Sequence, residues 1–110
     1  MDYSLDELTR AYRIMKNIRE FEERIRSEYQ QGKLPGFIHM YRNQEAIAVG
    51  ACLDMTNDDY IASTHRGHGH CIAKGCELEG MMLELACKQD GLCNGKGGSM
   101  HIADMTKGML

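Results

Sequence analysis

The first third of the chain shows a helical repeat of apolar positions. Ser4 and Glu7 form a capping box, in which each side chain can satisfy a free backbone N–H at a helix start. Apolar residues follow at helical spacing, namely Leu8, Tyr12, Met15, Ile18, Ile25 and Tyr29. Gly32 supplies a stop. The pattern predicts one long amphipathic helix over residues 4–31, within an N-terminal region 1–32. Because clean heptads are missing, the apolar stripe is expected to pack on the rest of the chain rather than in a coiled coil.

Shorter elements are predicted downstream. Asn43 is expected to cap a buried helix over residues 44–53, which is rich in Ala and Gly. Turn residues at 56–59 precede a short β-prone run at 60–63, which predicts a strand. A further helix is predicted from Glu77 to about Lys88, and residues 91–110 are expected to form a glycine-rich loop. The fold class expected is therefore mainly α, with a long helix, shorter helices and one or two short strands.

Composition narrows the class of protein without identifying it. The 110 residues are 43% hydrophobic and 26% charged, which is typical of one soluble globular unit. A net charge of −3 argues against nucleic-acid binding. The chain shows no apolar run of the roughly 20 residues that a membrane span needs, and its acidic start is unlike a secretory signal. A cytoplasmic location is expected, with all five cysteines as free thiols.

A cluster of basic side chains follows the predicted strand directly. His65, Arg66, His68 and His70 lie among glycines that let a ligand approach the backbone. Arg66 suits a phosphate, because its planar guanidinium donates two parallel hydrogen bonds and stays protonated. The structural alternative is a turn in which the histidines cap neighbouring backbone groups and Arg66 pairs with a carboxylate.

The same histidines, with the nearby cysteines, raise the possibility of a metal site. Structural zinc sites favour two short ligand pairs, and the spacing here lacks them, so no metal ligand is predicted. The cysteines at positions 52, 71, 76 and 87 are instead expected to be small buried hydrophobic residues.

Two further segments are candidates for chemistry. The run from Asn94 to Ser99 is similar to a phosphate-binding loop, but it lacks the order of a nucleotide-binding P-loop. His39 lies in a loop between two predicted helices, where an isolated histidine is usually a surface or capping residue. Neither segment identifies a function by itself.

Taken in order, these segments resemble one family over essentially the whole chain. It comprises the alpha subunits of the thiamine-diphosphate-dependent first component of pyruvate, branched-chain 2-oxo-acid and acetoin dehydrogenase complexes. The matching runs are Gly36-Phe37-Ile38-His39, Gln44-Glu45-Ala46, Asp59-Tyr60-Ile61, His65-Arg66-Gly67-His68-Gly69, Glu84-Leu85 and Gly95-Lys96-Gly97-Gly98-Ser99-Met100-His101. His65 favours the acetoin branch, because pyruvate enzymes usually have Tyr before the Arg.

The resemblance implies roles for seven residues. Arg66 would contact the cofactor diphosphate, with His65 in the neighbouring position. His39 would line the active-site channel as the catalytic histidine, where an imidazole that titrates near neutral pH can move a proton or orient the substrate. The loop closing around the cofactor would be built by Gly97, Gly98, Ser99 and His101.

The resemblance also implies cofactors, partners and a larger fold. Family members bind thiamine diphosphate and Mg²⁺ in an α/β domain shared with a beta subunit, cleave a carbon–carbon bond and pass the acyl unit to a lipoyl-bearing acyltransferase. The chain would be the N-terminal portion of such a subunit, truncated in the glycine-rich region 91–110. The family's magnesium motifs, Gly-Asp-Gly and a later Asn-Asn, do not occur in the 110 residues.

We therefore expect the isolated chain to bind little cofactor, to lack dehydrogenase activity and to form homo-oligomers that cover its apolar faces. Two alternatives stay open: a histidine and cysteine metal-binding module, and a non-catalytic helical protein that only contacts other subunits.

Overall fold

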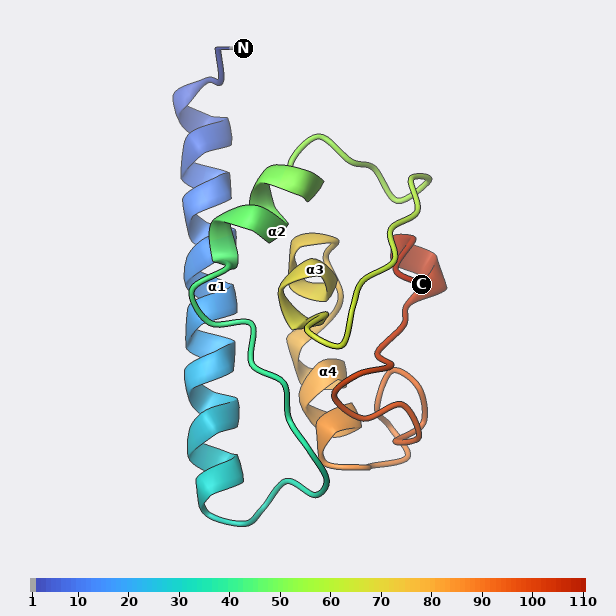
Figure 1. The fold of residues 1–110 in the computed structure, drawn as a ribbon. Coiled ribbons are helices and arrows are strands. Elements are labelled where there is room, and N and C mark those ends of the chain that lie inside the picture. Colours follow the sequence, from blue (N-terminus) through green and yellow to red (C-terminus); the bar gives the residue numbers. More distant parts are fainter. Residues whose placement is uncertain (1) are drawn as a thin grey trace.

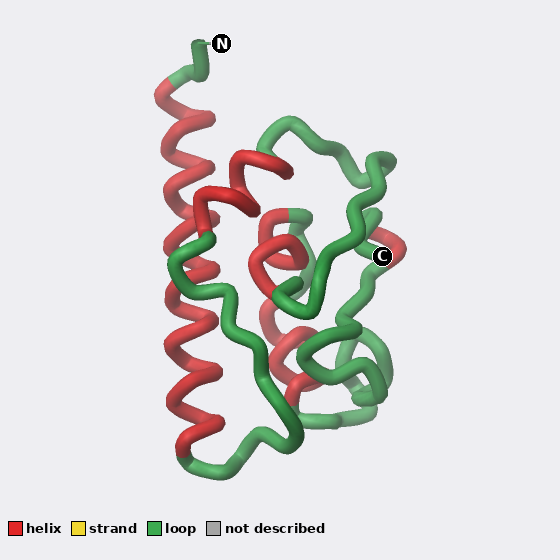
Figure 2. Tube along the Cα trace, in the orientation of Figure 1, coloured by secondary structure: helices red, strands yellow, loops and turns green. Residues whose placement is uncertain are grey.

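Helices dominate the computed structural model, which describes residues 2–110 (Figure 1). The elements in chain order are α1 (Leu5–Gln30), α2 (Glu45–Cys52), α3 (His68–Ala73), α4 (Leu78–Leu85) and a 3₁₀ helix, η1 (Met105–Lys107). Loops connect them and make up most of the chain after α4 (Figure 2). The predicted mainly α chain is confirmed.

Helix α1 begins at the predicted capping box. Ser4 Oγ accepts the Glu7 N–H (3.2 Å) and the Glu7 carboxylate accepts the Ser4 N–H (2.8 Å). The predicted apolar stripe is buried only in part: Ile18 and Ile25 are fully buried, whereas Leu8, Tyr12 and Tyr29 are 51%, 65% and 42% exposed. The first turns of α1 extend past α2 in Figure 1.

The start of α2 differs from the prediction. Its N-cap is Gln44, and no side chain caps it. Asn43 adopts a left-handed conformation (φ 71°), which asparagine tolerates better than most residues, and its Oδ1 accepts a hydrogen bond from Arg19 Nη2 (3.2 Å). The Glu45 carboxylate accepts a hydrogen bond from Arg19 Nε, which lowers the pKa of the Glu45 carboxyl. Side chains of α1 therefore anchor the entry to α2.

The predicted strand at 60–63 is reduced to a single bridge. Ile61 pairs in parallel with Met109, through its N–H to the Gly108 carbonyl and its carbonyl to the Leu110 N–H, both at 2.9 Å. No longer ladder forms among residues 2–110, where the other bridge joins Asp104 and Met109.

Helix α3 was not predicted, because its N-cap residue, Gly67, and its second residue, Gly69, are glycines, which disfavour a helix. Gly69 is needed there: a Cβ at this position would overlap the ring of Tyr41. The helix ends in a Schellman motif, with Gly75 left-handed (φ 89°) and the Cys76 N–H donating to the Cys71 carbonyl at 2.9 Å.

Helix α4 is shorter than the predicted span of 77–88. Cys87 adopts a left-handed conformation (φ 55°), and the Lys88 N–H donates to the Leu83 carbonyl at 2.9 Å, which closes the helix. Cys87 is consequently exposed, so its predicted burial is wrong, whereas the cysteines at positions 52, 71 and 76 are buried as expected. All five cysteines are free thiols.

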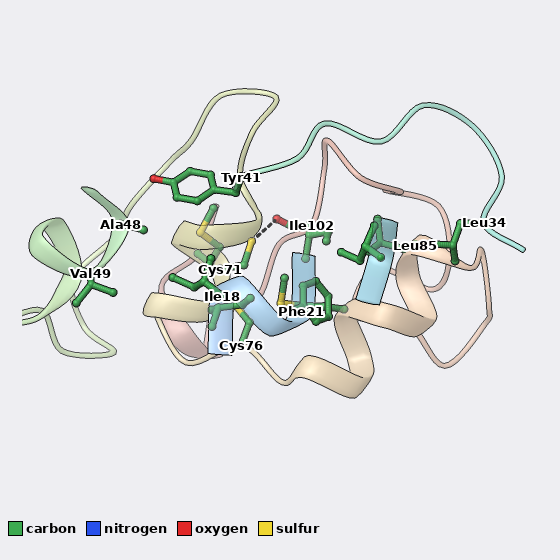
Figure 3. Close-up of a cluster of buried hydrophobic side chains, with 14 of the residues drawn as sticks. Ile18, Phe21, Leu34, Tyr41, Ala48, Val49, Cys71, Cys76, Leu85 and Ile102 are labelled. Carbon is green, nitrogen blue, oxygen red and sulfur yellow. Dashed lines mark hydrogen bonds between the residues drawn. The ribbon is translucent and has the colours of Figure 1, made fainter. Parts of the chain in front are cut away.

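The core lies between α1 and the three shorter helices. Figure 3 shows side chains from all parts of the chain meeting there. Its fully buried apolar members include Ile18, Ile25, Ala48 and Met81, each 0% exposed. Ile102 and Met109 bring the C-terminal segment into the same cluster, so the glycine-rich region is packed against the helices rather than loose. Within residues 2–110, no helix has the length and apolar character that crossing a membrane requires.

Candidate functional site

Three segments that lie far apart in the sequence converge beside α3. The His39 ring packs edge-on against the His65 ring, with 4.9 Å between centroids. The backbone N–H of His39 donates to Ser99 Oγ (3.2 Å), and Arg66 Nη1 donates to the Met40 carbonyl (2.6 Å). Four of the seven predicted site residues, His39, His65, Arg66 and Ser99, are thus brought together.

His101 faces a cavity on the same side of the chain. The cavity has a volume of about 300 Å³, and its lining includes Thr64, Gly67, Ser99 and His101. The His101 side chain is exposed, and its carbonyl accepts a weak hydrogen bond from Cys93 Sγ (3.5 Å). The cavity lining includes Thr64 and Gly67, which flank His65 and Arg66 in the chain, whereas His39, His65 and Arg66 are not among its lining residues.

Several guanidinium N–H groups of Arg66 form no hydrogen bond with the described residues. It is half-buried, and of its five guanidinium N–H groups only one on Nη1 has a partner among the described residues, the Met40 carbonyl. No carboxylate in residues 2–110 forms an ion pair with it, so the alternative in which Arg66 pairs with a carboxylate is wrong. A guanidinium anchored by one N–H and otherwise open can bind an anionic ligand.

His68 is part of a buried hydrogen-bonded chain that the sequence did not reveal. Its Nδ1 lies 2.7 Å from Glu22 Oε1 and its Nε2 lies 2.9 Å from Ser99 Oγ. Glu22 and His68 are 0% exposed and Ser99 is 8% exposed. Glu22 was missed, although one signal was present: it is a charged residue four positions after Ile18 and three before Ile25, on the buried face of α1.

The three histidines of the basic cluster, His65, His68 and His70, contact three different side chains. His65 packs on His39, His68 contacts Glu22, and His70 contacts Ser63 Oγ through Nδ1 at 2.7 Å. Burial lowers the pKa of His70. Nowhere in residues 2–110 do three His, Cys, Asp or Glu side chains gather in a way that could hold a metal ion. The metal-binding alternative thus lacks a ligand set in this part of the chain.

The glycine-rich loop already surrounds an anionic group, the carboxylate of Glu84. Four backbone N–H groups donate to it: those of Cys93 (2.8 Å) and Gly95 (2.8 Å) to Oε2, and those of Gly97 (2.6 Å) and Gly98 (3.2 Å) to Oε1. Glu84 is 0% exposed. Burial disfavours its ionisation, but the four hydrogen bonds outweigh burial and lower the pKa of the Glu84 carboxyl.

The hydrogen bonds to Glu84 limit which N–H donors near the site are free to bind a diphosphate. The N–H groups of Gly97 and Gly98 are directed at Glu84, so they have no free donor for a second anion. The remaining guanidinium donors of Arg66 and the exposed imidazole of His65 are not directed at a carboxylate of the described residues, so their chemistry is compatible with a diphosphate. Gly97 and Gly98 instead shape the loop that presents Ser99.

Comparison with known proteins gives a consistent result. The family model described as "Dehydrogenase E1 component" matches residues 13–110. The chain is 60% identical over 99 residues to the alpha subunit of acetoin:2,6-dichlorophenolindophenol oxidoreductase of Bacillus subtilis, covering 90% of this chain and 30% of that protein. The subunit of the same description from Cupriavidus necator is 54% identical over 103 residues, covering 94% and 31%.

A pyruvate dehydrogenase subunit is similar as well. The E1 component subunit alpha from Rhizobium meliloti is 41% identical over 106 residues, covering 96% of this chain and 30% of that protein. The chain thus spans about a third of the length of the curated relatives that it matches.

Proposed function

The chain belongs to the dehydrogenase E1 component family, and on that premise we propose that it forms the N-terminal part of the alpha subunit of a thiamine-diphosphate-dependent dehydrogenase. Acetoin is the substrate that we favour over pyruvate and other 2-oxo acids. The support is the higher identity to the two acetoin oxidoreductase subunits, 60% and 54% against 41%, and the histidine at position 65.

The single observation that carries the proposal is the convergence of His39, His65 and Arg66, with guanidinium donors of Arg66 left unused by the described residues. Arg66 would hold the diphosphate through its remaining donors, with His65 next to it. His39 would face the reacting end of the ligand and donate or accept a proton there. When bound, thiamine diphosphate supplies the electron sink for carbon–carbon bond cleavage.

The loop and the partners complete the proposal. Gly97, Gly98, Ser99 and His101 would form the wall of the pocket, with Ser99 linking that wall to the His39 backbone. A beta subunit would provide the rest of the cofactor site, and a lipoyl-bearing acyltransferase would accept the acyl unit. Mg²⁺ would be held by residues outside these 110, because the Gly-Asp-Gly and Asn-Asn motifs are absent from them.

Calorimetry can test whether the 110-residue chain contains enough of the site to bind thiamine diphosphate. The 110-residue chain alone is expected to bind thiamine diphosphate with Mg²⁺ weakly or not at all, while the complete alpha subunit with its beta subunit binds tightly. Arg66→Ala in the complete protein is expected to weaken binding by about 10–100-fold, since a hydrogen bond to a charged group contributes about 1.5–3 kcal/mol.

Arg13→Ala is the matched control, because Arg13 is exposed on α1, away from the converging segments. It removes the same charge and is expected to leave affinity within about twofold. Equal affinity of the Arg66→Ala and unmodified proteins would refute the role of Arg66, and tight binding by the 110-residue chain would refute the incompleteness of its site.

We also propose that the chain by itself self-associates. Leu5, Leu8 and Tyr12 on the first turns of α1 are 80%, 51% and 65% exposed, and Phe37 is 83% exposed. Exposed apolar side chains that lie together usually mark a surface that contacts another protein. Light scattering at micromolar concentration is expected to give a mass above 12.4 kDa, and a clean monomer would contradict this.

A further inference from the structure

The backbone of residues 39–41 is fixed by side chains rather than by a helix or strand. Three consecutive residues each use one backbone group: the His39 N–H donates to Ser99 Oγ (3.2 Å), the Met40 carbonyl accepts from Arg66 Nη1 (2.6 Å), and the Tyr41 N–H donates to Glu22 Oε2 (2.7 Å). These contacts fix the backbone that carries the His39 ring, which packs against His65. Any group that orients the three side chains therefore also orients His39.

Two of the three side chains are joined through His68. Glu22 Oε1 lies 2.7 Å from His68 Nδ1, and His68 Nε2 lies 2.9 Å from Ser99 Oγ. The chain Glu22–His68–Ser99 is buried, with Phe21 packed edge-on over the His68 ring at 6.3 Å between centroids. Water is thereby kept from the ring, and no buried side-chain nitrogen or oxygen among the described residues lacks a partner.

The hydrogen bonds in this chain run in one direction. A carboxylate only accepts, so Glu22 accepts from the Tyr41 N–H on one oxygen and from His68 Nδ1–H on the other. In a neutral imidazole with its proton on Nδ1, Nε2 is an acceptor for the Ser99 hydroxyl, and this is the state that we assign to His68. The Ser99 lone pairs then point away from His68 and accept the His39 N–H.

We propose that Glu22 is a positioning residue for His39, acting through the His68 tautomer and the Ser99 hydroxyl. The inference rests on the proposed function for the role of His39 at the active site. The chain Glu22–His68–Ser99 itself involves no cofactor, so it can be tested separately. A buried residue of α1 thereby helps to fix the geometry of the site.

The substitution Glu22→Gln has a distinctive consequence. A glutamine has one oxygen and one NH₂ where Glu22 has two oxygens, so in the same geometry it can accept from only one of the Tyr41 N–H and His68 Nδ1–H. Its oxygen is expected to keep the Tyr41 N–H, because a backbone N–H can only donate whereas an imidazole can change tautomer. The NH₂ then donates to Nδ1, and the ring proton moves to Nε2. His68 then donates to Ser99, whose hydroxyl proton must turn elsewhere. A purely space-filling role for Glu22 would leave the tautomer unchanged.

The experiment uses ¹⁵N-labelled histidine in the 110-residue chain, with the His68 signals assigned by their loss in His68→Gln. Unmodified protein is expected to show a protonated Nδ1 and an unprotonated Nε2. Glu22→Gln is expected to invert the two and to shift the backbone amide signal of His39. Glu23→Gln is the matched control: Glu23 is the next residue, pairs with Arg42 at the surface (2.7 Å), and is expected to change neither signal.

A second variant covers the case in which Glu22→Gln does not fold. Ser99→Ala removes the acceptor of the His39 N–H, so hydrogen exchange of that amide is expected to accelerate about five- to tenfold. The proposal is overturned by an Nε2–H tautomer in the unmodified protein, by an unchanged tautomer in folded Glu22→Gln, or by unchanged exchange in Ser99→Ala. Failure of cofactor binding in the complete protein would instead count against the proposed function alone.

Discussion

Glu84→Ala is expected to lower the free energy of unfolding by about 3–5 kcal/mol. The substitution leaves four backbone N–H groups, those of Cys93, Gly95, Gly97 and Gly98, without their acceptor. A buried donor without a partner costs roughly 1–3 kcal/mol, and the loop recovers part of that by opening to water. Because small domains are stable by only about 5–15 kcal/mol, the loss should be plain in urea or thermal unfolding followed by circular dichroism.

Two further variants show whether the carboxylate is responsible. Glu84→Gln keeps the shape and one acceptor oxygen, so it should fall between the alanine variant and the unmodified protein. Glu79→Ala removes an exposed carboxylate from the same helix and is expected to change stability by less than about 0.5 kcal/mol. A Glu84→Ala protein that unfolds at the same urea concentration as the Glu79→Ala protein would contradict the structural role of Glu84.

The same contacts give stability a pH dependence with a definite sign. The pKa of Glu84 is lower in the folded chain than in the unfolded chain, so its contribution is fully present above the unfolded pKa and is lost as pH falls through the folded one. The stability difference between unmodified protein and Glu84→Gln should therefore be largest near neutral pH and shrink in acid. A difference that grows toward acid would contradict this assignment.

Local signals in the sequence predicted the local structure well. The capping box of Ser4 and Glu7 located the start of α1, because it depends on residues three positions apart. The same reasoning missed α3, where Gly67 and Gly69 argue against a helix and the close packing of Gly69 on the Tyr41 ring explains only the second of them. It also overestimated the strand at 60–63, since a strand needs a partner and, among residues 2–110, only Met109 pairs with this segment.

In the candidate site, too, motifs along the chain could be recognised, but contacts between distant residues could not. The order of motifs along the chain identified His39, His65, Arg66 and Ser99, and the structure brings these four together. The contacts that hold them could not be predicted, because His68 reaches Glu22 across 46 positions and Ser99 across 31.

Glu84 was likewise missed as the group inside the glycine-rich loop. Its partners lie 9–14 positions away, beyond the end of its own helix. The run from Asn94 to Ser99 is similar to a phosphate-binding loop, and its backbone N–H groups do bind an anionic group. The anion that it binds is a side chain of the protein, which a pattern of glycines alone does not reveal.

His39→Ala in the complete alpha and beta protein is expected to lower kcat by about 100-fold or more. Proton transfer by a positioned side chain contributes roughly 10²–10⁴-fold, and 100-fold corresponds to about 2.7 kcal/mol in the activation barrier. The hydrogen bond from residue 39 to Ser99 uses the backbone N–H, so it survives the substitution. Affinity for thiamine diphosphate, measured by calorimetry, should stay within about threefold because Arg66 is retained.

Measuring both kcat and the affinity for thiamine diphosphate distinguishes a role of His39 in the chemical step from a role in cofactor binding. Loss of kcat with unchanged cofactor affinity assigns the His39 imidazole to the reacting end of the site, whereas parallel losses of both would place it among the binding groups. Lys88→Ala, at an exposed position after α4, is the control and should change neither quantity. An alanine variant that retains more than a third of the activity would show that His39 is not catalytic, and the edge-on packing of His39 against His65 would then serve only to orient His65 beside Arg66.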